Sequence, residues 1–387
     1  MRITAIRETA VKLESRLRNA AFSFDEMTTS IVAVATDVVR SGKPVIGYAF
    51  NSTGRYACGA QIRDRLAPRL MKAQAAGKVS IEPGAFDPDA VLAAMMVGEK
   101  PGGDMERSVG IGTIEIAVWD AVAKIAGAPA YQLIADHYNG GRVGQDVFCY
   151  IGGGWYLPGK GVPQLLEEVR RYLDWGYTLI KIKVGGVPLD EDIARIEAVL
   201  GLLGDPKRLA LDANCGIGPD RRPAYARAIK PYGLKWFEEA AHPVDYAGNA
   251  EFIGQYEGAV ATGENLFSVE DVVNLARYGG MRPGLDIIQT DTPQSYGIGT
   301  LARMLAGLAP MGWSARDVLP HGGNMMSLNL AVGLGLGMCE AYPDAFGVFS
   351  GYADDLKVCD GCIRAGDWHG FGFERQRELF ALMAKLA

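Results

Sequence analysis

The chain has 387 residues, of which 49% are hydrophobic and 22% are charged, and its formal net charge is −6. This composition excludes a disordered or low-complexity chain, and the acidic balance excludes the basic surface that binding to nucleic acid or an anionic membrane requires. The length allows two or three domains of about 150 residues, or a smaller domain beside an α/β barrel of about 250 residues.

The sequence carries no predicted targeting or membrane segment. Residues 1–16 lack the apolar core of a secretory signal, and no run reaches the ~18 apolar residues of a membrane span. The six cysteines are scattered, which is typical of reduced thiols rather than of a disulfide framework. We therefore expect a cytoplasmic protein without membrane or nucleic-acid partners.

Residues 1–125 predict an α+β domain. Three strand-like runs occupy residues 3–13, 30–39 and 44–50, and helical patterns follow at about 87–96 and 106–125.

From about residue 146 short apolar runs alternate with amphipathic helical patterns. The runs are 147–152, 179–185, 209–216, 236–240, 260–265, 287–291, 318–323 and 346–351. Helical patterns between them include 164–175, 191–203, 269–278 and 298–311. Eight such repeats predict a closed parallel α/β barrel over residues 126–359.

Six of these runs carry a polar or ionisable residue at or near their end, in a common register. The residues are Lys183, Asp212, Glu238, Glu264, Asp291 and His321, separated by 29, 26, 26, 27 and 30 positions. One strand–helix unit of a barrel takes about 25 to 30 residues. The six side chains are therefore expected at the C-terminal ends of consecutive strands, where barrel enzymes carry their chemistry.

Asp212, Glu238 and Glu264 are predicted to bind Mg²⁺. Three inward carboxylates cannot all remain ionised without a cation between them, and all-oxygen ligation suits Mg²⁺. Each carboxylate alone would fit equally well as a cap on the following helix, but capping does not explain the shared period. Asn214 and Glu239 adjoin the ligands and are predicted to support them.

Lys181 and Lys183 are predicted to point into the barrel together, because strand side chains alternate. Ile180 and Ile182 should then face the helices. Two adjacent ammonium groups near a divalent cation would have lowered pKa values, so that a neutral lysine could act as a base. The alternative is a pair of solvated lysines at a strand edge.

Asp291 and His321 are predicted to form an acid–base pair across the barrel from the lysines. An Asp that accepts a hydrogen bond from one imidazole nitrogen fixes the tautomer and raises the basicity of the other nitrogen. A cation flanked by two proton-transfer groups suits removal of a proton from the carbon next to a carboxylate.

The motifs KIKVGG, LDAN, WFEE, ATGENLFS, DIIQTD and PHGGN strongly resemble the mandelate racemase-like branch of the enolase superfamily. Further segments, among them GYAFNSTGRYACG, MMVGEKPGG and PHGGNMMSLN, are similar to the D-tartrate dehydratases of that branch. The resemblance implies a modified (β/α)7β TIM-type barrel with an N-terminal capping domain, on which the tail 360–387 packs. It also implies a homo-oligomer, with Mg²⁺ on Asp212, Glu238 and Glu264.

The resemblance implies a catalytic assignment as well. Lys183 would remove the α-proton of a small hydroxy carboxylic acid. His321, supported by Asp291, would protonate the departing β-hydroxyl, leaving a 2-keto acid (oxaloacetate if the substrate is tartrate).

Substrate contacts of the resembled group fall on Asn19, Lys100, Lys181 and Glu340. His321 is counted with them because the departing hydroxyl must reach it. The sequence departs from the group at Thr53, where an Asn is expected, and at Trp155, where a Tyr is expected. Asn324 also replaces a His. Because Thr53 and Trp155 are expected to line the substrate site, another hydroxy diacid or an acid sugar remains an alternative substrate.

Two other functions remain open. A racemase or epimerase would need the same lysine and histidine, whereas a non-catalytic carboxylate-binding protein would need no acid–base pair. Three other patterns are rejected: the phosphate-loop-like segment 154–161 lacks its Ser or Thr, Cys359-x-x-Cys362 lacks a second ligand pair, and the glycine run 333–337 does not fit a dinucleotide fingerprint.

Overall fold

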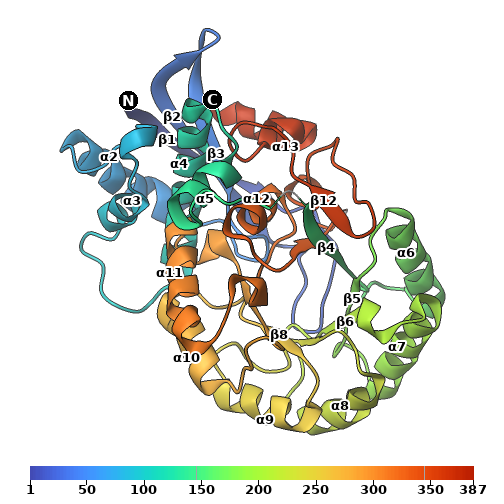
Figure 1. Cartoon of the computed structure of the whole chain (residues 1–387). Helices are drawn as coiled ribbons and strands as arrows, with labels where there is room; N and C mark the ends of the chain where they lie inside the picture. The colour runs from blue at the N-terminus through green and yellow to red at the C-terminus, as the bar shows by residue number, and fades with distance from the viewer. Residues whose placement is uncertain (145, 344) are drawn as a thin grey trace.

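A computed structural model describes residues 1–144, 146–343 and 345–387. It contains a three-stranded antiparallel sheet with flanking helices and a nearly closed barrel of eight parallel strands (Figure 1). Within these residues, no helix is both long enough and apolar enough to cross a bilayer.

The N-terminal sheet has the order β1-β2-β3, with β1 at Ile3–Lys12, β2 at Thr28–Arg40 and β3 at Lys43–Phe50. The helices that follow are α1 (Gly59–Gln61), α2 (Ala67–Ala75), α3 (Pro88–Met95), α4 (Met105–Ala126) and α5 (Ala130–Tyr138). A single π-helical stretch, Ile62–Leu66, joins α1 to α2. The predicted strands and the helices near 87–96 and 106–125 are confirmed.

The barrel strands are β4 (Asp146–Gly153), β5 (Ile180–Lys183), β6 (Leu209–Asp212), β7 (Phe237–Glu238), β8 (Val260–Thr262), β9 (Ile287–Thr290), β10 (Val318–Pro320) and β11 (Cys339–Ala341). They are ordered β10-β9-β8-β7-β6-β5-β4-β11, and β12 (Cys362–Arg364) pairs antiparallel with β4. The surrounding helices are α6 (Val162–Asp174), α7 (Leu189–Leu203), α8 (Arg222–Ile229), α9 (Tyr246–Tyr256), α10 (Val269–Tyr278), α11 (Ile298–Leu308) and α12 (Met325–Leu334). Helices α6 to α11 form the outer ring in Figure 1.

The predicted eighth strand at 346–351 is wrong. The last parallel strand is β11, which pairs with β4, whereas Gly347–Phe349 forms a short 3-10 turn. Gly347 has a φ of 55°, a left-handed conformation that does not continue a strand. The apolar character of this segment reflects the burial of Phe346 and Phe349 rather than strand pairing.

Side chains alternate along the barrel strands as expected. Ile180 and Ile182 belong to the large core beneath the helices, whereas Leu179, Ala210 and Trp236 form a small separate core inside the barrel. Because Ala210 and Trp236 stand two residues before Asp212 and Glu238, these carboxylates also point inward, one layer higher.

The C-terminal tail, with α13 at Arg377–Met383, lies against the N-terminal domain (Figure 1). The rings of Tyr48 and Phe380 are 5.9 Å apart, and the Lys124 ammonium lies 2.5 Å from Glu374. The loop 13–27 between β1 and β2 reaches toward the mouth of the barrel, where its residue Asn19 lines a cavity with barrel side chains.

Helix α4 packs closely against loop 291–297, which follows β9. A Cβ added at Gly112 would lie 2.5 Å from the carbonyl oxygen of Pro293. We expect Gly112→Ala to destabilise the fold by about 1–3 kcal/mol, because the backbone of the loop must move. Gly201→Ala, on the exposed side of α7 with nothing within 4 Å of the added Cβ, should instead stabilise by up to about 1 kcal/mol. Thermal unfolding of both variants checks the opposite signs.

Glu115 of α4 accepts hydrogen bonds from the backbone at the start of α11. Ile298 N and Gly299 N donate at 2.9 and 3.1 Å, and Trp119 Nε1 donates at 2.8 Å. Burial outweighs these donors and raises the pKa of Glu115 from its ordinary value of 4.5 to about 7. The folded state therefore holds the proton more tightly than the unfolded chain.

The stability of the wild type relative to Glu115→Gln should consequently depend on pH. The contribution of the Glu115 carboxyl group to stability is fully present below pH 4.5 and is lost as the pH rises through 7. We expect the difference in unfolding free energy to fall by about 3 kcal/mol over this window. Denaturant unfolding at several pH values measures it, with Glu106→Gln on the exposed first turn of α4 as the control. A difference that rises with pH would contradict the assignment.

Candidate active site

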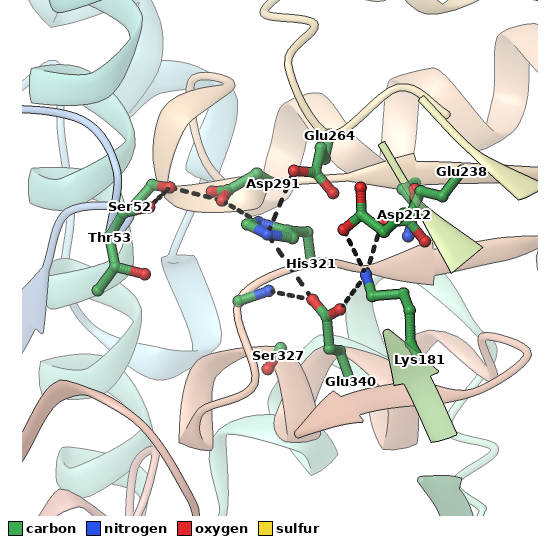
Figure 2. Close-up of polar contacts among 12 residues, drawn as sticks. Ser52, Thr53, Lys181, Asp212, Glu238, Glu264, Asp291, His321, Ser327 and Glu340 are labelled. Atoms are coloured by element: carbon green, nitrogen blue, oxygen red, sulfur yellow. Dashed lines mark hydrogen bonds and ion pairs between the residues drawn. The ribbon is translucent and has the colours of Figure 1, made fainter. Parts of the chain in front are cut away.

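The end of β5 brings two lysines into a ring of carboxylates, and Figure 2 shows the first of them, Lys181, beside Glu238 and Glu340. Lys181 Nζ lies 2.5 Å from Glu238 Oε1, 2.5 Å from Glu340 Oε1 and 3.4 Å from Asp212 Oδ2. Lys183 Nζ lies 2.5 Å from Asp212 Oδ2. All five side chains are buried.

The charges in this cluster act on one another. Burial would raise the pKa of Asp212, but Lys183 and Lys181 outweigh it and hold that pKa well below its usual range. Burial would likewise lower the pKa of Lys181, but Glu238 and Glu340 raise it well above its usual value. The two carboxylates therefore stabilise the charged form of Lys181 in this arrangement, and the lowered pKa expected beside a divalent cation stays a prediction.

His321 is held from both sides. Its Nδ1 lies 2.8 Å from Asp291 Oδ2, and its Nε2 lies 3.6 Å from Glu264 Oε1 and 3.7 Å from Glu340 Oε2. Burial would lower the pKa of His321, but Glu264, Asp291 and Glu340 outweigh it and raise the pKa to about 10. The imidazole is therefore protonated at neutral pH and suited to donate a proton from Nε2.

The cap domain reaches this pair directly. Ser52 Oγ donates a hydrogen bond of 2.6 Å to Asp291 Oδ2, the oxygen that also contacts His321 (Figure 2). Ser52 was not predicted from the sequence, in which only the neighbouring Thr53 was expected to line the substrate site.

Among the described residues, Glu264 and Glu239 form no ion pair with either lysine. Burial and the surrounding carboxylates raise the pKa of Glu264 to about 8 and that of Glu239 to about 7. Glu264 Oε2 is buried without a hydrogen-bond partner among the described residues. Asn214 N donates to Asp212 Oδ1 at 2.9 Å, and Asn265 Nδ2 donates to Glu239 Oε1 at 2.6 Å.

The predicted metal ligands do not form a ready-made cluster. In the described part of the chain, no three acidic, histidine or cysteine side chains stand in a metal-binding arrangement. Asp212 and Glu238 instead contact the ammonium groups of the two lysines. The residue types still fit a divalent cation. The site holds more carboxylate groups than lysines, carboxylate oxygens are the ligands that such a cation prefers, and Glu264 Oε2 lacks a hydrogen-bond partner among the described residues.

A cavity opens at the C-terminal ends of the strands, between the barrel and the cap. Of the predicted site residues it is lined by Asn19, Thr53, Trp155, Lys183, Glu264 and His321. Others lie buried behind this lining, namely Lys181, Asp212, Glu238, Asp291 and Glu340. Lys100 is exposed and does not line the cavity; its carbonyl oxygen accepts a hydrogen bond from Arg107 at 2.9 Å.

One wall of the cavity is aromatic. The Trp155 ring lies with its centroid 4.3 Å from Lys183 Nζ and packs edge-on against Phe24. Tyr342 and Phe346 continue this wall, and none of Phe24, Tyr342 and Phe346 was predicted. Tyr342 follows Glu340 by two residues, so strand alternation was the signal that could have found it.

Asn19 fixes the conformation of its own loop while it faces the cavity. Its Oδ1 accepts hydrogen bonds of 2.9 Å from both Ala21 N and Phe22 N. The amide nitrogen makes no hydrogen bond to the described residues, so it is free to donate to a ligand in the cavity.

Comparison with known proteins identifies the family. Residues 164–379 match the family described as enolase C-terminal domain-like. The chain is 32% identical over 274 residues to 3,6-anhydro-alpha-L-galactonate cycloisomerase of Streptomyces coelicolor, covering 68% of this chain and 70% of that protein. It is 30% identical over 264 residues to L-talarate/galactarate dehydratase of Salmonella typhimurium, covering 68% of this chain but only 62% of the dehydratase.

Solved structures agree with the fold. The same Salmonella dehydratase, liganded with Mg and L-lyxarohydroxamate, matches with a TM-score of 0.74 and 24% identity over 95% of this chain and 88% of that one. A racemase from Streptomyces coelicolor with bound magnesium matches with a TM-score of 0.77 and 25% identity over 97% and 99%. The chain therefore belongs to the enolase C-terminal domain-like family, in the mandelate racemase and muconate lactonizing enzyme branch of the enolase superfamily.

Proposed function

We propose that the protein is a Mg²⁺-dependent dehydratase of a small hydroxy diacid or acid sugar, such as D-tartrate. The observation that carries the proposal is that Lys183, at the end of β5, and His321, directly after β10, line one cavity, with Asp291 contacting His321 from behind. The dehydratase relative supports the reaction class. Trp155, Thr53 and Asn19 would contact the substrate from the cavity wall, with Lys181 and Glu340 behind them, whereas Lys100 lies outside this cavity.

The proposed reaction begins at the carbon next to the substrate carboxylate. Lys183 Nζ, as the neutral amine, accepts the α-proton, and the electron pair moves into an enediolate. His321 Nε2 then protonates the β-hydroxyl as the carbon–oxygen bond breaks, so that water leaves and an enol remains. The enol takes up a proton at its β-carbon and releases its hydroxyl proton, which gives a 2-keto acid.

The metal would be held by Asp212, Glu238 and Glu264. Magnesium, when bound, supplies the positive charge that stabilises the enediolate. The matching racemase and dehydratase structures both contain bound magnesium, which supports this cofactor. Lys183 and Lys181 both contact Asp212 here and so adjoin the proposed ligand set.

A Mg²⁺ titration tests the ligand assignment without relying on turnover. We expect Mg²⁺ to raise the melting temperature of the chelator-treated protein, because binding to the native state stabilises it. Asp212→Asn should lose this shift and Asp205→Asn, an exposed aspartate before β6, should keep it. An unchanged shift in Asp212→Asn would contradict the assignment, and dehydration should disappear with the chelator and return with Mg²⁺.

A racemase or epimerase is the second candidate. It is favoured by the magnesium-bound racemase among the matching structures and by two proton-transfer groups at one cavity. A screen of acid sugars and hydroxy diacids with Mg²⁺, read as 2-keto acid formation, separates the two functions. Formation of a 2-keto acid supports dehydration, whereas a stereoisomer as the product supports epimerisation.

A further inference from the structure

Arg55 belongs to loop 51–58, which joins β3 to α1, and it lines the same cavity as Lys183 and His321. Its guanidinium stacks over Phe267, with the central carbon 4.9 Å from the ring centroid. The sequence analysis did not select it.

The Arg55 guanidinium has only uncharged hydrogen-bond partners. Its Nε donates to Gln294 Oε1 at 2.8 Å, and its Nη2 donates to Asn265 Oδ1 at 2.5 Å. No carboxylate among the described residues forms an ion pair with it, whereas Lys181 and Lys183 both have anionic partners. A guanidinium remains charged at any physiological pH, and a partly buried charge without a counter-ion is costly.

The hydrogen bonds hold the guanidinium in one orientation. Nε and Nη2 form one of its two-donor edges, and both are occupied. The other edge, made by Nη1 and the second Nη2 hydrogen, makes no hydrogen bond or ion pair with the described residues. This is the fork that binds a carboxylate through two parallel hydrogen bonds.

The side-chain amides of Gln294 and Asn265, which orient Arg55, are themselves held by hydrogen bonds. Gln294 Nε2 donates to the carbonyl oxygen of Glu264 at 2.5 Å, and Asn265 Nδ2 donates to Glu239 Oε1 at 2.6 Å. Both amide oxygens must therefore face Arg55. The free edge is pre-organised, which lowers the entropy cost of binding an anion there.

We infer that Arg55 binds a second carboxylate of the substrate, at the end remote from the carbon that loses its proton. This inference rests on the proposed function and narrows it to dicarboxylic acids. The first carboxylate would lie near Lys183 and the metal ligands, while Arg55 selects diacids over monoacids of the same length.

Matched acid pairs test the inference, because each pair differs only in a terminal carboxylate or hydroxymethyl group. The pairs are D-tartrate with the threonate of the same configuration and galactarate with galactonate. With Mg²⁺ present, kcat/KM is measured for turnover and the dissociation constant is measured by calorimetry. The proteins are the wild type, Arg55→Gln, Arg55→Lys and the exposed control Arg364→Gln.

We expect Arg55→Gln to weaken binding of the diacid of each pair by about 10- to 150-fold, which is the range for hydrogen bonds to a charged group. The monoacid should change by less than about threefold, and Arg55→Lys should fall between wild type and Arg55→Gln for the diacid, because it keeps the charge but loses the fork. Arg364→Gln should match the wild type.

Equal losses of affinity for the diacid and the monoacid would overturn the inference, because Arg55 would then only support the loop. The absence of any loss would overturn it as well. Melting temperatures and the monoacid arm show whether Arg55→Gln still folds. If the wild type turns over a monoacid but binds no diacid, the inference about Arg55 is wrong while the proposed function stands. If the wild type turns over no acid, the proposed function is wrong. Calorimetry still tests Arg55 in that case, and absent diacid binding would overturn the inference as well.

Discussion

Lys183→Ala is expected to lower kcat for dehydration by about 10²- to 10⁴-fold, the contribution of a general base. The variant lacks the Nζ that faces the cavity beside Trp155. It should also stop exchange of the substrate α-proton with solvent, because proton removal precedes every later step. Formation of 2-keto acid and uptake of deuterium from D₂O, both followed by NMR, measure the two losses together.

The fold of this variant should survive, because Asp212 still has Lys181 at 3.4 Å as a cationic partner. Lys357→Ala, at an exposed position outside the cavity, is the matched control and should retain full activity. If Lys183→Ala kept dehydrating at the wild-type rate, the base would have to be another group.

His321→Asn is expected to separate proton removal from water loss. The Asn amide can still donate to Asp291, but it cannot release a proton to a departing hydroxyl. Dehydration should fall by about 10²- to 10⁴-fold. Exchange of the α-proton should continue, because Lys183 is unchanged and the enediolate can take a proton back from it. Deuterium uptake without 2-keto acid is the expected result.

An epimerase gives a different pattern in this variant. There, His321 would be the base for one stereoisomer, and its replacement would stop exchange from that isomer while leaving exchange from the other. Loss of exchange from a single isomer, with no effect on the formation of 2-keto acid, would contradict the role of His321 as the acid.

The positions of the strand-end residues could be predicted because they depend on a local repeat. The spacing of Lys183, Asp212 and Glu238 follows from the length of one strand and one helix, and the alternation of Ile180 and Ile182 follows from strand geometry. Neither requires knowledge of contacts between distant parts of the chain.

The contribution of the cap could not be predicted in this way. Ser52 and Arg55 reach Asp291 and Gln294 across 239 positions of sequence, and no periodic pattern encodes such a contact. The ion pair between Lys181 and Glu340 could not be predicted either, because it depends on β11, which brings Glu340 Oε1 within 2.5 Å of Lys181 Nζ. The eighth strand was misplaced since burial alone makes residues 346–351 apolar.

Analysis of the product by mass spectrometry and NMR tests the central claim most directly. The substrate found in the screen is incubated with the Mg²⁺-loaded enzyme in H₂O and in D₂O. The account predicts a 2-keto acid lighter than the substrate by one water, carrying solvent deuterium at the carbon next to the keto group when formed in D₂O. A product of the same mass as the substrate in H₂O, differing only in configuration, would contradict it.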